Sequence, residues 1–159
     1  KKTLGTYKPV SLAEENRWFD GLLTSQSDQV FVIEVPEEGA SVTSPSTARP
    51  IGMCGIHRID WKNRHCMLGI LIGNAADRGR VLGTDAVRVL VRYAHEELGL
   101  MRVWLDVFTT NKNAIKSYEN VGFVVEGTQR SATFRDGKFQ DLLLMSCLFG
   151  ELTKAKAAR

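Results

Sequence analysis

Residues 67–98 read MLGILIGNAADRGRVLGTDAVRVLVRYAHEEL, which is an apolar run, a glycine-containing loop and a periodic apolar segment. The apolar run belongs to His65–Ile72, which has the length of a strand. After the loop, apolar residues recur at the i, i+4 and i+8 spacing of one buried helical face, and Gly99 follows as a natural stop. This face consists of Val81, Leu82, Ala86, Val87, Leu90, Val91, Ala94 and Leu98. The segment therefore predicts a strand, a loop and the main helix of the fold.

The residues before this unit predict one helix and two strands. Ser11-Leu12-Ala13-Glu14 has the capping-box pattern S-x-x-E and predicts a helix that ends near Leu23. Strands are predicted at Val30–Val35, a β-branched run, and at Ile51–Ile59. Between them, residues 36–50 are rich in Pro, Ser and Thr and predict a long loop. The helix carries an apolar face made of Leu12, Trp18, Phe19, Leu22 and Leu23.

The residues after the unit predict a strand, a helix and a hairpin. Arg102–Phe108 is apolar on both sides, as expected of a strand with both faces covered. A helix is predicted over residues 111–121. Residues 123–134 and 138–148 then form two strands joined at Asp136-Gly137, a favoured hairpin turn. The order of elements predicts a mixed sheet with helices on its faces, which is an α/β (α+β) fold.

Size and composition indicate one globular domain. The chain has 159 residues and 17.7 kDa, with 43% hydrophobic and 25% charged residues, and we expect a single domain over residues 1–159. No apolar stretch reaches the roughly 18 residues of a membrane-spanning helix, and no secretory leader is visible, so no membrane partner is expected.

Most of the positive charge lies at the ends of the chain. Lys1, Lys2, Lys154, Lys156 and Arg159 carry five charges, and subtracting them from the net charge of +3 leaves −2. A nucleic-acid-binding domain clusters its basic residues on one face, so nucleic acid is not an expected partner. We interpret residues 150–159 as a solvated basic tail. RNA binding through this tail is the alternative, which its deletion would test.

The cysteines predict neither a disulfide framework nor a metal site. Cys54, Cys66 and Cys147 are an odd number without a CxxC pair, which is typical of a reducing cytoplasm. Cys54-x-x-His57 and His65-Cys66 lie on neighbouring predicted strands, but residues adjacent or three apart on a strand point to opposite faces. At most two of these four side chains can converge, whereas zinc needs four ligands. No metal is therefore expected.

Residues 77–84, DRGRVLGT, lie where a loop leads into a helix. Unpaired N–H groups and the helix dipole favour an anion at such a terminus, glycines allow close approach, and arginines bind phosphate oxygens. The pattern therefore predicts a site for a cofactor that carries a diphosphate. The Walker and Rossmann glycine patterns are both absent, which disfavours two classes of nucleotide-dependent enzyme.

The same loop resembles the Gln/Arg-x-x-Gly-x-Gly/Ala acetyl-CoA signature of the GNAT superfamily of N-acetyltransferases. Residues 111–123, NKNAIKSYENVGF, resemble its N-x-x-A-I-x-x-Y-E-x-x-G-F segment nearly position for position. Residues 11–23, 125–127 and 134–138, together with Asp141, are similar to the branch that contains ribosomal-protein N-terminal acetyltransferases and spermidine acetyltransferases. The resemblance runs from about residue 9 to 149, and residues 111–127 are its most specific part.

This resemblance implies a mostly antiparallel central sheet that splays in the middle to take acetyl-CoA. It implies that a free strand edge at Leu68, Ile70 and Ile72 pairs with the pantetheine arm, and that Asn111 and Ala114 contact the cosubstrate. The diphosphate would bind the loop residues Arg78, Gly79, Arg80, Val81, Leu82, Gly83 and Thr84.

Three features depart from the family pattern. Val81 stands where the signature has its first glycine, and a branched side chain there can hinder a tight phosphate-binding turn. Relatives often carry a glutamate on the strand before the loop, and Met67 and its neighbours offer none. The chain starts at Lys1 rather than Met, and we expect that an upstream strand and helix of the family are missing from it.

The implied activity is transfer of an acetyl group from acetyl-CoA to a primary amine, such as a protein N-terminus, a polyamine or another small amine. Tyr118 would be the general acid for the leaving thiolate, and its alternative role is a core aromatic. Asn111 is alternatively a plain N-cap. Glu34, His57 and Asp60 are candidates for the base, which stays unassigned. A non-catalytic acyl-CoA sensor is the rival function, and a homodimer is common among relatives.

Overall fold

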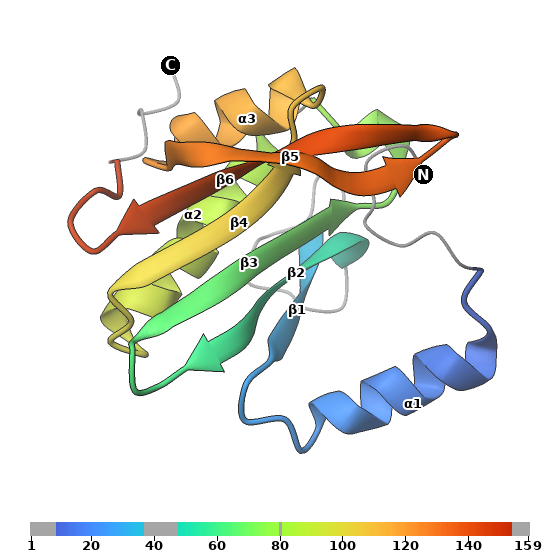
Figure 1. The fold of residues 1–159 in the computed structure, drawn as a ribbon. Coiled ribbons are helices and arrows are strands. Elements are labelled where there is room, and N and C mark those ends of the chain that lie inside the picture. Colours follow the sequence, from blue (N-terminus) through green and yellow to red (C-terminus); the bar gives the residue numbers. More distant parts are fainter. Residues whose placement is uncertain (1–8, 37–47, 80, 154–159) are drawn as a thin grey trace.

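The computed structural model describes residues 9–36, 48–79 and 81–153, which form a six-stranded sheet and three α-helices (Figure 1). The strand order is β1-β2-β3-β4-β6-β5, and every neighbouring pair is antiparallel except β3 and β4. This confirms the mixed, mostly antiparallel sheet. In chain order the elements are α1 (Leu12–Leu22), β1 (Gln29–Pro36), β2 (Ala48–Asp60), β3 (His65–Ile72), α2 (Leu82–Glu96), β4 (Arg102–Phe108), α3 (Lys112–Glu119), β5 (Val124–Arg135) and β6 (Lys138–Leu148).

The predicted loop at 36–50 is wrong at both ends. Pro36 is the last residue of β1, and Ala48–Pro50 are the first residues of β2, because these two segments pair with each other. Pro50 is tolerated there because β3 pairs with β2 only from Gly52 onward, so Pro50 faces one strand rather than two. Residues 37–47 lie outside the described residues.

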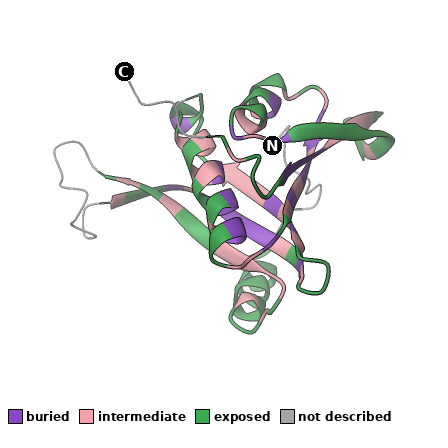
Figure 2. Cartoon of the chain, turned by 90° about the vertical axis from the view of Figure 1, so that its left-hand side faces the viewer, coloured by how far each residue is buried: buried purple, intermediate pink, exposed green. Residues whose placement is uncertain are grey.

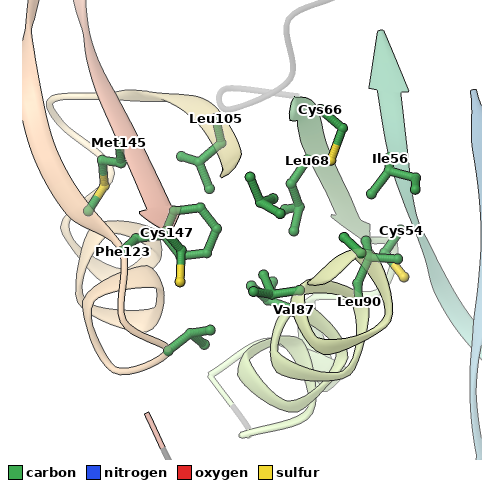
Figure 3. Packing of buried hydrophobic residues seen from close by; sticks show 14 of the residues in the cluster. Cys54, Ile56, Cys66, Leu68, Val87, Leu90, Leu105, Phe123, Met145 and Cys147 are labelled. Carbon is green, nitrogen blue, oxygen red and sulfur yellow. The ribbon is translucent and has the colours of Figure 1, made fainter. Parts of the chain in front are cut away.

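The hydrophobic core lies between the sheet and the helices α2 and α3, on what we call the inner face of the sheet. α2 contributes Val87, Leu90, Val91 and Ala94, all fully or almost fully buried. Alternate strand residues point into this core from the sheet, as Figure 3 shows for Ile56, Leu68, Leu105, Met145 and Cys147. Figure 2 shows this buried layer in purple beneath α2. Gly99 (φ +65°) ends the α2 segment as the sequence predicts.

The opposite, outer face of the sheet carries the other half of each strand. His57 and Met67 lie opposite each other on β2 and β3, and Trp104 and Asp106 alternate with the buried inner residues of β4. Cys54 and Cys66 are buried in the core, so they point away from His57. The cysteines in the described residues are all free thiols that form no disulfide bond.

α1 differs from the other helices because it buries none of its residues. Its capping box is present: Ser11 and Glu14 hydrogen-bond each other's backbone N–H. Its apolar side chains are nevertheless largely exposed, and Leu12 and Phe19 retain 75% and 59% of their surface. None of the described helices is long and apolar enough to cross a membrane.

Candidate active site

β3 and β4 are paired at one end only, and they form the fork around which the candidate site is built. The parallel ladder joins His65–Met67 to Arg102–Trp104 and then stops, so the strands diverge (Figure 1). Beyond Met67, residues 68–72 have no strand partner on the β4 side among the described residues. Free N–H and C=O groups on a strand edge can pair with an extended ligand. The predicted residues Leu68, Ile70 and Ile72 belong to this edge.

The first turn of α2 is open to a ligand. Val81 is its N-cap and makes no capping bond, so the N–H groups of Leu82, Gly83 and Thr84 lack a side-chain cap. Val81 has φ −56° and ψ −11°, which any residue adopts, and its side chain is exposed. Its branched side chain is therefore compatible with the turn. Gly79 has φ +74°, a conformation that favours glycine.

The loop before α2 is anchored to the sheet by charged side chains. Arg78 donates to two backbone carbonyls at the end of β3, at 3.0 and 2.8 Å, so its guanidinium is held against the strand. Asp77 is buried and accepts two hydrogen bonds from Arg49 of β2, at 3.0 and 2.8 Å. Arg80 lies outside the described residues. The pair Arg49–Asp77 joins segments 28 residues apart and is invisible in a local motif.

α3 starts beside the first turn of α2. Asn111 is its N-cap: the side-chain oxygen accepts a hydrogen bond from the backbone N–H of Ala114 at 3.3 Å. The capping role of Asn111 is therefore present, and its amide nitrogen remains as a donor. Thr84 and Ser117 join α2 to α3 through their hydroxyl groups, which lie 2.6 Å apart. The predicted cofactor residues of both helices thus lie on one connected unit.

Tyr118 follows Ser117 on α3 and packs against the core, where its ring lies 5.7 Å from that of Phe123. Burial raises the pKa of the Tyr118 phenol to about 12, because the phenolate would be poorly solvated. The phenol is therefore protonated throughout the physiological range. Its hydroxyl group has no hydrogen-bond partner within the described ranges. Tyr118 is thus a packed core aromatic, and its hydroxyl group keeps an unused hydrogen-bond donor.

The outer face of the fork carries polar groups that sequence reasoning missed or left open. His57 Nδ1 lies 3.1 Å from a carboxylate oxygen of Asp28. Asp106 on β4 accepts a hydrogen bond of 2.6 Å from the Gln129 side chain. Burial raises the pKa of the Asp106 carboxyl group, although the bond from Gln129 and the charge of Arg58 oppose that shift. Strand alternation places Asp106 outward, but only the sheet order brings it opposite β3.

The other two candidate bases lie elsewhere. Glu34 belongs to the lining of an apolar cavity of about 440 Å³ between β1 and α2. Asp60 accepts hydrogen bonds from the backbone and side chain of Asn63, in the turn between β2 and β3. No group of three or more His, Cys, Asp or Glu side chains in the described part of the chain is arranged to hold a metal ion.

Comparison with known proteins identifies relatives of this chain. A sequence model described as an acetyltransferase (GNAT) domain matches residues 2–124. A putative ribosomal N-acetyltransferase, YdaF from Bacillus subtilis, is 34% identical over 97 residues, which are 61% of this chain and 52% of YdaF. The spermidine N(1)-acetyltransferase of Escherichia coli K12 is 28% identical over 131 residues, which are 82% of this chain and 63% of that enzyme. The chain thus spans between half and two thirds of these relatives.

A solved structure has the same fold. The spermidine N-acetyltransferase from Vibrio cholerae, crystallised in complex with CoA and spermine, superposes with a TM-score of 0.77. The match covers 90% of this chain and 78% of the other, at 22% sequence identity.

Proposed function

Because the chain belongs to the GNAT acetyltransferase family, we propose that it transfers the acetyl group of acetyl-CoA to a primary amine. The observation that supports this most is the fork: a sheet whose strands β3 and β4 part after three residue pairs. Such an opening exposes a strand edge to a ligand without unfolding the sheet, because the neighbouring pairs β2–β3 and β4–β6 hold each strand in place.

We assign three parts of the chain to acetyl-CoA. The free edge at residues 68–72 would pair with the amides of the pantetheine arm. The uncapped N–H groups at residues 82–84, together with the helix dipole, would bind the diphosphate. Asn111 would donate its remaining amide hydrogens to the arm or to an ordered water. All three fit the chemistry of the cosubstrate, which offers amides and a diphosphate.

The reaction would be a direct attack. The amine nitrogen attacks the thioester carbon, and the carbon–sulfur bond breaks as the thiolate leaves. Holding amine and thioester together supplies much of the rate enhancement, and Tyr118 donates a hydrogen bond to the departing sulfur. Since the pKa of Tyr118 is about 12 and that of a thiol about 8.5, a hydrogen bond is favoured over complete proton transfer.

The acceptor is proposed to be a cationic amine, such as a polyamine. Two relatives support this: the E. coli and V. cholerae proteins are named as spermidine acetyltransferases. The charge of −2 that remains without the five terminal basic residues also suits a cation. We further propose a single catalytic domain that acts in the cytoplasm, as the cysteine content suggests, and a homodimer.

Calorimetric titration with acetyl-CoA tests the proposal, with desulfo-CoA and NADH as comparison ligands. We expect saturable binding of both CoA compounds and none of NADH. A panel of spermidine, spermine, an N-terminal peptide and an amino sugar then identifies the acceptor by CoA release. Absence of CoA binding would contradict the proposal. Binding of CoA without turnover on any amine would instead support an acyl-CoA sensor.

A further inference from the structure

We propose that His57 is the general base that removes a proton from the acceptor amine, with Asp28 as its positioning residue. This inference rests on the proposed acetyl transfer. It supplies a base where relatives often carry a glutamate and where this chain has none at Met67 or its neighbours. His57 lies on β2, outside every motif that carries the family resemblance.

The position of His57 relative to the fork is the first argument. His57 and Met67 are direct partners in the β2–β3 ladder, and Met67 is the last β3 residue paired with β4. His57 therefore lies at the level where the strands part. A Cβ built on Gly69 would lie 3.3 Å from His57 Nε2, and one built on Gly55 would lie 3.0 Å away. The imidazole thus extends over β3 at its free part, and the two glycines leave room for it.

The orientation of the ring is the second argument. The Asp28 carboxylate lies 3.1 Å from Nδ1 and also accepts hydrogen bonds from Ser25 and Ser27, at 3.0 and 2.7 Å. The bond from Ser27, followed by those from Ser25 and His57, lowers the pKa of Asp28 despite its partial burial. An ionised Asp28 accepts a hydrogen bond from the Nδ1–H group, which leaves Nε2 of a neutral ring as the proton acceptor. In the described structure Nε2 has no hydrogen-bond partner.

The charge opposite His57 is the third argument. Met67 pairs with Trp104 in the last step of the ladder, and Gly69 and Asp106 lie two residues further along the diverging strands, on either side of the fork. Asp106 can bind the ammonium form of the amine while His57 lies over Gly69. The remaining charged groups on these strands are engaged: His65 lies 3.8 Å from Asp60, and Arg102 pairs with Glu126. Arg58 follows His57 in the sequence, and its positive charge favours the ionised form of Asp106 because it lowers the pKa of that carboxyl group.

The acceptor ammonium group loses two protons during the transfer. The bound ammonium gives one proton to His57 Nε2, and the free amine forms the carbon–nitrogen bond. The second proton leaves nitrogen as the carbon–sulfur bond breaks, and the departing sulfur takes up a proton, so that CoA leaves as the thiol. His57 then passes its proton to water. Tyr118 packs against the core on the inner face of the sheet, and His57 lies on the outer face. Tyr118 therefore contacts the leaving sulfur and His57 the amine from opposite faces of the sheet.

The test compares His57→Asn with wild type. Asn keeps a donor for Asp28 and removes Nε2. We expect kcat/KM at pH 7 to fall about 10²- to 10⁴-fold, with the Kd of acetyl-CoA unchanged. Wild-type activity should rise with pH along an acidic limb and then level off, because only the neutral imidazole can accept the proton of the amine. His57→Asn should lack this limb and instead gain activity continuously toward the pKa of the amine, about 10.

Two further variants separate this role from a structural one. Asp28→Asn should lower kcat while the Kd of acetyl-CoA stays unchanged, because His57 loses the acceptor that fixes its tautomer and orientation. His65→Asn, on the same face of β3, should leave the profile unchanged. His57→Gln serves as the second variant if His57→Asn melts well below wild type.

The possible outcomes are distinct. Wild type that acetylates no amine overturns the proposed function. Active wild type with an unchanged limb in both His57 variants overturns the assignment of His57. Loss of that limb in Asp106→Asn but not in the His57 variants would identify Asp106 as the base and overturn the assignment as well.

Discussion

At the scale of single residues, Tyr118 combines a packing contact with a free hydrogen-bond donor. Its ring contributes to the core beside Phe123, and its hydroxyl group is without a partner in the described residues. Replacement by Phe retains the ring and removes only the donor. We expect Tyr118→Phe to lower kcat about 10²-fold or more while the Kd of acetyl-CoA and the melting temperature stay near wild type, measured by steady-state kinetics, calorimetry and thermal unfolding.

Tyr93 offers the matched control for that experiment. It is a tyrosine of α2 whose hydroxyl donates to the Gln29 side chain at 2.9 Å, at the β1 side of the sheet. Tyr93→Phe should leave kcat unchanged. Equal activity of Tyr118→Phe and wild type would remove Tyr118 from the mechanism.

Substitutions of Val81 and Gly79 in the same loop are expected to have different consequences for acetyl-CoA binding. Val81 has ordinary helical backbone angles and an exposed side chain, so Val81→Gly should leave the affinity for acetyl-CoA within about twofold of wild type. Gly79 has φ +74°, and Gly79→Val should cost about 1–2 kcal/mol of strain and weaken acetyl-CoA binding. Calorimetry measures both affinities. Tighter binding by Val81→Gly would show that the branched side chain obstructs the site.

At the scale of elements, β4, β5 and β6 are joined on the outer face by one carboxylate. Glu126 lies at an irregularity of β5, is paired with both terminal nitrogens of Arg102, and accepts a hydrogen bond of 2.7 Å from Ser146. Arg102 first, and Ser146 after it, lower the pKa of Glu126 from 4.5 to about 2. This network holds β4 against β6 and β5 at the end of the sheet where β3 and β4 are still paired.

We expect Glu126→Gln to lower the free energy of unfolding at pH 7 by about 1 kcal/mol, since the pair is partly exposed and screened. A carboxylate whose pKa is lowered by folding stabilises the protein above its unfolded pKa. The difference between wild type and Glu126→Gln should therefore be full above about pH 5 and disappear as pH falls toward 2. Urea unfolding across this range measures it. A difference that persists at pH 2 would contradict an electrostatic origin.

At the scale of the whole molecule, the buried thiols report on cooperative unfolding. Cys66 and Cys147 are fully buried, and burial raises the pKa of each thiol to about 12. Groups whose pKa is raised by folding contribute stability below the unfolded pKa, about 9, which is lost as pH rises toward 12. We expect stability to fall steeply above pH 9. Thiol-specific labelling at pH 8 should proceed at the rate of global unfolding, and rapid labelling of Cys66 or Cys147 would contradict this.

The sequence alone determined most of the elements and the family. Apolar periodicity identified α2, Asp136-Gly137 identified the β5–β6 hairpin, and residues 111–123 carried the family pattern, because each of these signals is written in a short segment. The boundary of β2 was missed, since Ala48–Pro50 become a strand only by pairing with β1. Composition likewise could not reveal that the apolar face of α1 is exposed.

Only the tertiary structure decided which distant residues meet. The pairs Asp28–His57, Arg49–Asp77 and Asp106–Gln129 join residues 23 to 29 positions apart. Their proximity depends on strand order and register, which depend on the packing of all six strands rather than on any one segment. The fork has the same origin, because the length of the β3–β4 ladder follows from how both strands are held by their other neighbours. Local sequence thus specified the parts, and the sheet as a whole positioned the chemistry.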